Sequence, residues 1–410
     1  MRNAILALAA LVSACGSEPK ETTEEPVKGA SSPTKTYGDD VAFLEHHLDV
    51  TELSDASGKS RVAVVGEYQG RVMTSTSGGA SGPSYGWIHR EAIASGERKP
   101  HINVFGGEDR FWLGPEGGQY SIFFEKDDPF DLEHWQTPEP IDWGAWEVVS
   151  RDGAQVQFQK SMDLVNYAGT RLTLDAFRTI RLVDPAASGI PMGPGTEAVA
   201  YESENTITNR GENAWTKETG LLSIWILGMF NPSPTTTVVL PFMAGPEETL
   251  GPTVNDAYFG TVPRDRLVIG EGVLYFRGDG EYRSKIGLSR KRALPIMGSY
   301  DGSAFVLTLV EYTLPENATD YVNSMWELQG EPYRGDVVNS YNDGPPAPGA
   351  KPLGPFYELE SSSPAAALSP GESLTHVHQT FHFRGPEAEL DAIVQKALGV
   401  SVRDIVGAFP

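Results

Sequence analysis

Cysteine is nearly absent from this sequence of 410 residues, which contains a single one, Cys15. A chain with one thiol forms no internal disulfide, so its stability has to come from a packed core. Long apolar runs are also missing after residue 15, where no stretch approaches the ~18–20 apolar residues of a transmembrane helix. These absences exclude a disulfide-stapled scaffold and a protein that crosses a membrane with several helices.

Basic residues are scarce as well. Lysine and arginine total 32 against 55 aspartate and glutamate residues, which gives a net charge of −23 at pH 7. This charge opposes binding to nucleic acid and adsorption to anionic lipid. Neutral polysaccharide is a ligand class that the composition does not discourage, although acidic surfaces are also common in exported proteins. No motif requires a cofactor.

The first fifteen residues have the pattern of an exported lipoprotein. Arg2 supplies a short positive segment, Ala4–Val12 is apolar, and small residues lead directly to Cys15. This stretch resembles the bacterial lipobox, in which the cysteine is lipidated and becomes the new N-terminus. An ordinary secretory signal with a chance cysteine is the alternative. No aspartate follows at Gly16 or Ser17, which by the same resemblance favours an outer-membrane anchor facing the periplasm.

The remaining sequence predicts a tether and one β domain. Residues 16–37 are poor in apolar side chains and predict a disordered tether, and residues 38–410 predict the folded domain. Asp39–Leu48 and Pro386–Val406 have apolar residues at helical spacing. Between them, runs rich in β-branched and aromatic residues predict a mainly β fold of stacked antiparallel sheets, with short N- and C-terminal helices. The predicted strands are Arg61–Tyr68, Arg71–Ser77, Ala145–Ser150, Gln155–Lys160, Thr170–Leu182, Ala198–Asn209, Leu221–Leu227, Thr236–Pro241, Arg266–Ile269, Val273–Arg277, Ser303–Tyr312 and Leu374–Phe383.

The segment His101–Glu125 combines apolar ends with a charged centre. Ile102–Phe105 and Tyr120–Phe124 predict strands, and the glycines between them predict tight turns. Carboxylates and an arginine suit sugar hydroxyls, and an aromatic ring suits the apolar face of a pyranose. We therefore predict a carbohydrate-binding loop, with a hairpin of solvated ion pairs as the alternative. Its candidate ligand-binding residues are Glu108, Asp109, Arg110, Trp112, Glu116 and Gln119.

Three segments carry a resemblance to a known superfamily. Thr206–Asn209, Gly107–Glu116 and Phe356–Gly371 resemble members of the galactose-mutarotase-like (aldose 1-epimerase-like) superfamily, and more closely a bacterial lipoprotein family of undescribed function within it. The resemblance is diffuse over about residues 60–385. It implies a β-supersandwich that binds carbohydrate or acts on it.

The resemblance carries over only in part to catalytic residues. An aldose 1-epimerase of that superfamily uses a mid-chain histidine as general acid and a late glutamate as general base. No histidine lies between His134 and His376 in this sequence, so the acid has no counterpart. Glu358 and Glu360 are late glutamates that match the base. The resemblance therefore makes plain mutarotation doubtful.

The strand periodicity of Phe356–Glu360 gives a separate reason to single out these glutamates. Glu358 and Glu360 lie on one face of the strand, ~7 Å apart. Two neighbouring carboxylates raise one another's pKa, which lets one of them stay protonated and act as an acid. We predict that both are catalytic, with Glu358 as the principal group. An edge strand with a solvated acidic face is the alternative.

Histidines alternate with apolar residues in Leu374–Phe383. His376, His378 and His382 share one face of this strand. If the apolar face packs inward, the histidines line the opposite surface, where His378 is a candidate for proton transfer in concert with a glutamate. His376 and His378 are also candidate ligands of a divalent metal, with Glu358 as the third ligand. Unpaired histidines on a polar sheet face are the alternative.

Two further segments carry polar candidates. Asp336–Gly344 predicts a strand that ends in an Asn-Asp-Gly turn, which is also typical of hairpins. Its side chains Asn339, Asn342 and Asp343 are candidate ligand-binding residues, because amides and carboxylates suit vicinal hydroxyls or a hard cation. Arg283–Arg292 is the one basic concentration, a candidate contact for an anionic sugar or else a solvated loop.

Three functions therefore remain open. The chain is a carbohydrate-active enzyme with epimerase, hydrolase or lyase chemistry, a non-catalytic glycan-binding protein, or a structural envelope lipoprotein. Geometry separates them. Convergence of Glu358, Arg110, Glu116 and His378 on one cavity favours the enzyme, and side chains that point to different faces exclude it.

Overall fold

The computed structural model describes residues 36–409. The predicted signal peptide with Cys15, and residues 16–35 of the predicted tether, lie outside this range. Helix α1 (Tyr37–His47) begins with a capping box in which Thr36 and Asp39 bond each other's backbone N–H. Tyr37 is buried. It therefore belongs to the folded domain and not to the tether.

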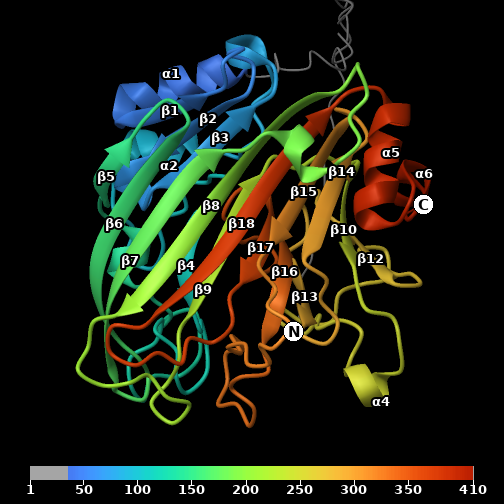
Figure 1. Cartoon of the computed structure of the whole chain (residues 1–410). Coiled ribbons are helices and arrows are strands. Elements are labelled where there is room, and N and C mark those ends of the chain that lie inside the picture. Colours follow the sequence, from blue (N-terminus) through green and yellow to red (C-terminus); the bar gives the residue numbers. More distant parts are fainter. Residues whose placement is uncertain (1–35, 410) are drawn as a thin grey trace, which may run out of the picture. The chain divides into compact units, whose positions relative to one another are not determined.

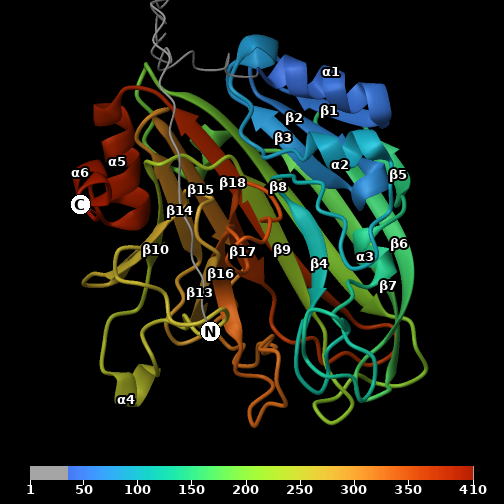
Figure 2. The same ribbon diagram turned by 180° about the vertical axis from the view of Figure 1, so that it is seen from behind.

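The strands of the described residues form three antiparallel sheets (Figures 1 and 2). The three-stranded sheet has the order β1 (Val50–Ser54), β2 (Arg61–Val65), β3 (Arg71–Thr76). The ten-stranded sheet has the order β11 (Leu267–Ile269), β12 (Val273–Arg277), β10 (Thr236–Pro241), β14 (Ile296–Asp301), β15 (Val306–Tyr312), β18 (Ser373–Arg384), β8 (Glu197–Asn209), β7 (Arg171–Leu182), β6 (Gln155–Val165), β5 (Glu147–Arg151). The five-stranded sheet has the order β13 (Ser284–Ser289), β16 (Asp336–Asn342), β17 (Tyr357–Ser362), β9 (Ser223–Phe230), β4 (Arg110–Gly114).

Helices are short and lie between or beside these sheets. Besides α1, they are α2 (Arg90–Ser95), α3 (Glu139–Asp142), α4 (Glu247–Leu250), α5 (Glu387–Leu398) and α6 (Val402–Val406). None of the helices in the described range is long and apolar enough to cross a membrane. The predicted fold class, mainly β with stacked antiparallel sheets and short helices near both ends, is confirmed.

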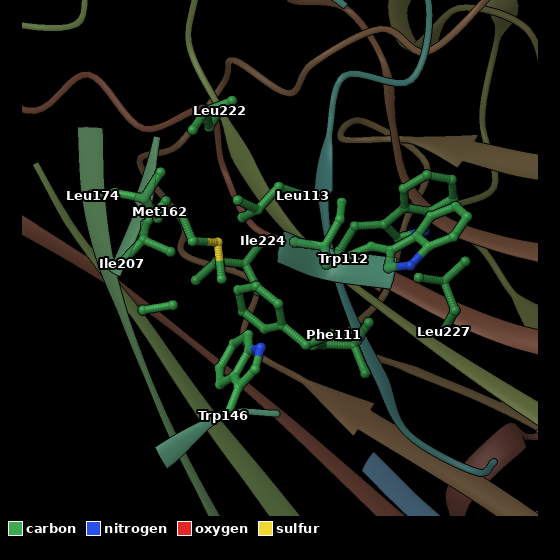
Figure 3. Packing of buried hydrophobic residues seen from close by; sticks show 14 of the residues in the cluster. Phe111, Trp112, Leu113, Trp146, Met162, Leu174, Ile207, Leu222, Ile224 and Leu227 are labelled. Carbon is green, nitrogen blue, oxygen red and sulfur yellow. The ribbon is translucent and has the colours of Figure 1, made fainter. Parts of the chain in front are cut away.

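The five-stranded and ten-stranded sheets pack face to face around one apolar core. Phe111 and Leu113 of β4 point into this core, toward Met162 and Leu174 of the ten-stranded sheet (Figure 3). Alternation along the strand turns Trp112 to the other side of the sheet. Burial of each large apolar side chain stabilises such a core by about 1.5–3 kcal/mol. The five-stranded sheet therefore has an inner, core-facing side and an outer side that remains for other contacts.

Helix α5 covers the ten-stranded sheet on its far side. Leu390, Ile393 and Val394 of α5 pack with Phe381 and Phe383 of β18. The aromatic face of β18 is therefore its outer face, beneath the helix. Alternation along the strand then points the opposite face toward the five-stranded sheet.

This arrangement corrects the predicted orientation of the histidines. The sequence predicted that His376, His378 and His382 line an open surface, but each of them is completely buried. Their strand offers two sides that both become buried, one beneath α5 and one between the sheets. Alternation of residue types separates the two sides but does not say which element covers each.

The two strands predicted at the ends of His101–Glu125 are also wrong. The structure has no strand at 102–105 or 120–124, and the ladder forms instead over Arg110–Gly114, which pairs with β9. Val104 and Phe105 are buried without joining a ladder. Their apolar character therefore reported burial and not strand structure.

Candidate functional site

A cavity of about 510 Å³ lies over the outer side of the five-stranded sheet. This volume falls within the ~300–1,000 Å³ that is usual for small-molecule sites. Each of the five strands contributes to its floor, and loops around residues 101–104, 132–135, 325–327 and 343–356 form its walls. Its lining is rich in aromatic rings: Trp112, Trp135, Trp225, Tyr258, Phe259, Trp326, Tyr341 and Phe356.

Strand register places the polar groups of the floor in two neighbouring rows. Glu358 of β17 is paired with Tyr341 of β16, which in turn is paired with Lys285 of β13. In the next row, Arg110 of β4 and Glu360 of β17 flank strand β9. Residues two apart on one strand share a face. Two cations and two carboxylates therefore project from the same side of the sheet.

A double glycine makes the turn into β4 possible. Gly106 and Gly107 have φ values of +89° and +106°, which other residues rarely adopt. A Cβ atom at Gly106 would lie 2.1 Å from the carbonyl oxygen of Trp87. These two residues therefore let the chain pass close to its neighbour just before Arg110.

Arg110 and Glu358 form a buried hydrogen-bonded pair on the cavity floor. The Nη2 group of Arg110 donates a hydrogen bond to Oε1 of Glu358 at 3.1 Å, and their side chains are only 4% and 8% exposed. The guanidinium carbon of Arg110 also lies 4.1 Å from the centre of a Trp112 ring. This cation–π contact holds the arginine in place. The indole thus positions the cation that faces the carboxyl group.

Burial raises the pKa of the Glu358 carboxyl from 4.5 to about 8. The charge of Arg110 lowers this pKa, but burial and the negative charge of Glu360 outweigh it. A carboxyl group with such a pKa has both its acid and its base form available near neutral pH. This is the property that general acid–base catalysis requires.

Lys285 and Glu360 form the second buried pair. The Nζ group of Lys285 donates to Oε2 of Glu360 at 2.8 Å, and Nε1 of Trp225 donates to the same oxygen at 2.9 Å. Burial lowers the pKa of Lys285, but the charges of Glu360 and Glu116 outweigh burial and raise it overall. Lys285 is therefore a fixed positive charge beside the cavity. Glu360 lies beneath it with no exposed surface.

Besides the exposed Glu327, two more carboxyl groups line the cavity, and both have raised pKa values. Burial raises the pKa of Glu116 and of Asp343. Asp343 accepts hydrogen bonds from the hydroxyl of Tyr341 at 2.9 Å and from the N–H of Gly354 at 2.8 Å. These contacts fix its carboxyl orientation. Together with Glu358, the cavity holds three carboxyl groups that retain a proton at higher pH than usual.

The structure thus brings together some of the sequence-predicted residues and separates others. Three of the four residues whose convergence would favour an enzyme, Glu358, Arg110 and Glu116, line one cavity, and Trp112 and Asp343 line it too. His378 does not. The predicted residues that lie elsewhere are Glu108, Asp109, Gln119, Asn339, Asn342, Glu360, His376 and His378.

Glu108 and Asp109 are placed between the sheets, which corrects their prediction as ligand-binding residues. Glu108 accepts hydrogen bonds from Ser75 and from the hydroxyl of Tyr201. Asp109 is paired with Arg178, and both of these side chains have no exposed surface. Carboxylates that are sealed and bonded in this way support the fold and do not meet a ligand.

Gln119, Asn339 and Asn342 bond neighbouring loops and strands instead of facing the cavity. Gln119 exchanges two hydrogen bonds with the backbone of Gln329. Asn342 accepts from the N–H of Gly280 at 2.8 Å, and Asn339 donates to the carbonyl of Ile286 at 3.3 Å. The Asn-Asp-Gly sequence does not form a tight hairpin, because the connection from β16 to β17 is long. The amide of Asn342 instead bonds residues 279–282, in the connection between β12 and β13.

The histidines do not form the predicted metal site. Nε2 of His376 and Nδ1 of His378 both lie 2.8 Å from the hydroxyl of Ser361. Glu358 projects from the opposite face of the sheet, so it cannot supply a third ligand. Among the described residues, no group of three or more His, Cys, Asp or Glu side chains is placed to hold a metal ion.

Sequence reasoning missed several residues of the cavity. Arg283 and Lys285 were predicted only as members of the basic run, a candidate contact for an anionic sugar, and Tyr341 only as a hydrogen-bonding group of Asp336–Gly344. Phe356 and Trp225 were assigned no role. The usable signal was alternation: Lys285, Tyr341 and Glu358 each lie on the outer face of their strand. Recognising it would have required the strand order, which no local pattern contains.

Comparisons with known proteins assign no activity to the chain. Residues 35–409 match DUF6786, described as a family of unknown function. No curated protein matches the chain.

The solved structures to which the chain is similar include the Slr1438 protein of Synechocystis sp. PCC 6803, at 13% identity and a TM-score of 0.48 over 83% of this chain and 96% of that one. A galactose mutarotase-like protein from Lactobacillus casei ATCC 334 is 10% identical, with a TM-score of 0.44 over 82% and 100% of the two chains. A galactose mutarotase related enzyme from Lactobacillus acidophilus is 8% identical, with a TM-score of 0.45 over 82% and 97%. The names of the last two are those of the superfamily that the sequence resembles. Because these TM-scores lie below 0.5, we infer the function of the cavity from the residues that line it and not from these structures.

Proposed function

We propose that this chain, which belongs to the DUF6786 family, binds a carbohydrate in the aromatic cavity and catalyses proton transfer on it. The function of that family is unknown, so membership assigns no activity. Glu358 is the acid–base group. The observation that carries this proposal is the position of its carboxyl on the floor of the cavity, beside a cation held over Trp112.

The lining of the cavity supports a sugar as the ligand. Aromatic faces stack on the apolar faces of pyranose rings, and a few fixed polar groups orient the hydroxyls. Arg110 is fixed by Trp112 and by Glu358, so a sugar hydroxyl near this pair meets a preorganised donor and a proton acceptor together. Rings on several sides and a charged pair on the floor make one continuous site.

Acid–base catalysis by Glu358 requires a second group, which accepts a proton when Glu358 donates one or donates a proton when Glu358 accepts one. Glu116 and Asp343 line the same cavity and hold their protons at raised pKa. Epimerisation, hydrolysis and elimination at a sugar each need one group that donates a proton and one that accepts it. Glu358 with either carboxyl supplies such a pair. His378 takes no part in it, because it lies between the sheets.

Binding without chemistry is the second candidate function. It is favoured by the contacts Arg110–Glu358 and Lys285–Glu360, which give each cation of the floor a carboxyl partner within the protein. A binding protein needs the aromatic walls but no titrating carboxyl. The two functions therefore differ in the expected effect of replacing the titrating carboxyl of Glu358. An enzyme would lose turnover, whereas a binding protein has no turnover to lose.

Glu358→Gln tests the proposed role directly. Glutamine keeps the size of the side chain and removes its acid–base function. After a glycan array has identified a ligand, we expect turnover to fall ~10²–10⁴-fold while binding changes little. Glu327→Gln is the matched control, since Glu327 also lines the cavity but is exposed at its mouth. Near-normal turnover in Glu358→Gln would exclude the catalytic role, and a wild-type protein that binds but never turns over a ligand would favour the second function.

We also propose that Cys15 anchors the protein by lipid in the bacterial outer membrane, facing the periplasm. The support is the lipobox-like sequence before Cys15 and the absence of an aspartate directly after it. Cys15→Ser should move the protein from the membrane fraction to the soluble fraction. A variant that stays in the membrane fraction through a high-salt wash would contradict the anchor.

A further inference from the structure

The basic run Arg283–Arg292 divides into residues that support loops and residues that face the cavity. Arg292 is buried and donates to backbone carbonyls, among them that of Met243 at 2.9 Å. Arg290 donates to the carbonyl of Ala318 at 3.1 Å. Arg283 and Lys285, at the start of the run, line the cavity instead. The charge that reaches the cavity from this run therefore comes from two side chains.

Two cations at the cavity have no carboxylate partner among the described residues. Lys285 is paired with Glu360 and Arg110 with Glu358, whereas Arg283 and Lys351 have no carboxylate oxygen within 4.0 Å. Lys351 belongs to the loop between β16 and β17, so it approaches from a different part of the chain. Other lysines and arginines of the described residues also lack a carboxylate partner, but Arg283 and Lys351 are the two of them that line this cavity.

Arg283 is held in place by neighbouring groups and not by an acid. Its guanidinium carbon lies 3.8 Å from the centre of the Phe259 ring, which also lines the cavity. The nearby carboxyl of Asp343 is already bonded by Tyr341 and by the N–H of Gly354. The flat face of the guanidinium is therefore covered by the ring, and its edge lies beside the hydroxyl of Tyr341, which leaves further N–H groups for another acceptor.

The register also gives the distance between this cation and the acid–base group. Ser284 is paired with Asn342, so Arg283 lies just beyond the end of the ladder, on the outer side with Lys285. Strand β16 separates β13 from β17, and Arg283 lies two residues beyond the row of Lys285 and Glu358, which puts the backbones of Arg283 and Glu358 about 12 Å apart. A sugar ring and the two side chains fill such a span. One ligand can thus contact both groups.

We infer that the carbohydrate is anionic, and that Arg283, with Lys351, binds the carboxylate or sulfate of an acidic sugar residue while Glu358 faces its reacting carbon. This rests on the proposed function. The planar guanidinium suits an oxyanion because it presents two parallel N–H donors. A neutral sugar would leave both cations without an acceptor.

A glycan array that holds uronate-containing and sulfated glycans beside their neutral counterparts tests the ligand class. The full-length protein should bind acidic glycans and favour them over the neutral forms. Methyl esters of the uronates, which keep the size and remove the charge, should bind as weakly as the neutral forms. Separate uronate and sulfate sets distinguish the two anions. Equal or tighter binding of the neutral glycans would overturn the inference and leave the proposed function standing, whereas no carbohydrate binding at all would overturn both.

Arg283→Gln then tests the residue. The dissociation constant of the best acidic glycan, measured by calorimetry, should rise about 10-fold or more, because a hydrogen bond to a charged group is lost. Binding of the neutral counterpart should stay unchanged, and the salt dependence of acidic binding should decrease. Arg171→Gln is the matched control, since it removes an exposed cation from strand β7. Unchanged acidic binding in Arg283→Gln, or an equal loss in the control, would overturn the assignment.

Discussion

Two clusters of buried charged residues lie on opposite sides of the five-stranded sheet, and they differ in access to solvent. The inner cluster contains Arg178 and Asp109, whose side chains have no exposed surface. The outer cluster contains Arg110 and Glu358, which line the cavity. Asp109 of the inner pair and both residues of the outer pair were predicted from the sequence as functional groups. Only the outer pair is placed where a ligand can reach it.

In the inner cluster, each nitrogen of the Arg178 guanidinium donates a hydrogen bond. Arg178 donates to the side chain of Asn205 at 2.7 Å and to the backbone carbonyls of Gly70 and Asp109. Nε2 of His382 lies 2.9 Å from a carboxylate oxygen of Glu108. These contacts connect β7, β8 and β18 to the residues that directly precede β3 and β4. Their geometry is that of a cross-link between the sheets.

Shifted pKa values occur on both sides of the sheet, so they do not identify the site. Burial lowers the pKa of His376 to about 3 and that of His378 to about 4 in the inner cluster. Burial raises the pKa of Glu358 to about 8 on the outer side. The common cause is removal from water. What distinguishes Glu358 is the cavity above it.

Arg178→Met should produce the largest effect. It leaves the carboxylate of Asp109 buried without its partner, which typically costs about 3–5 kcal/mol of unfolding free energy. Urea denaturation of the two proteins measures the difference. Arg171→Met, on the same strand but with a side chain that is 69% exposed, should change stability by no more than about 0.5 kcal/mol. Equal stability of both variants would show that the inner pair does not support the fold.

Most strands were predictable because alternation of side chains survives in the sequence. The predicted run Val273–Arg277 coincides with β12, and Ala198–Asn209 matches β8 within one residue. Strand β4 was missed because its neighbours Glu108 and Asp109 are charged. A strand that is buried on both sides normally reads as apolar. Here the buried charges are neutralised by partners from other strands, which no local pattern records.

The site was less predictable than the fold because it is assembled from distant segments. Arg110 and Glu358 are 248 positions apart in the chain. Each was recognised as a polar residue in a strand-like segment, but their pairing depends on the order β17, β9, β4. His378 was misplaced for the same reason, since helix α5 covers the aromatic side of its strand. Local periodicity gives the two faces of a strand and tertiary packing decides between them.

The second largest effect should be on the pH dependence of the unfolding free energy, which reports whether Glu358 of the outer cluster is protonated in the folded protein. The folded protein holds the proton of Glu358 up to about pH 8, whereas the ordinary value is 4.5. The stabilising contribution of Glu358 to the unfolding free energy is therefore fully present below about pH 4.5 and is lost as the pH rises toward 8. Glu358→Gln does not titrate. Relative to the wild type it should gain stability over this window, by no more than about 1.4 kcal/mol per pH unit.

Denaturation of both proteins at pH 5, 7 and 9 measures this difference, and the titrations that the two proteins share cancel in it. We expect nearly equal stability at pH 5 and a more stable variant at pH 9. A variant that loses stability at pH 9 would mean that Arg110 stabilises an ionised Glu358. The pKa of the folded protein would then lie below 4.5, and the group would be a structural ion pair like the inner one.

The smallest effect should come from neighbouring serines on opposite faces of β17. The hydroxyl of Ser361 lies 2.8 Å from a nitrogen of His376 and from one of His378, and the other ring nitrogens of both residues have no partner among the described residues. Ser361→Ala should therefore lower the unfolding free energy by about 1–3 kcal/mol, the penalty for buried polar groups left unpaired.

Carbohydrate binding should not change in Ser361→Ala, because these histidines are sealed from the cavity. Ser362→Ala is the control on the outer face, and it should leave stability within about 0.5 kcal/mol of the wild type. Altered binding in Ser361→Ala without a loss of stability would mean that the inner histidines communicate with the cavity, and the division between a structural side and a functional side of this sheet would fail.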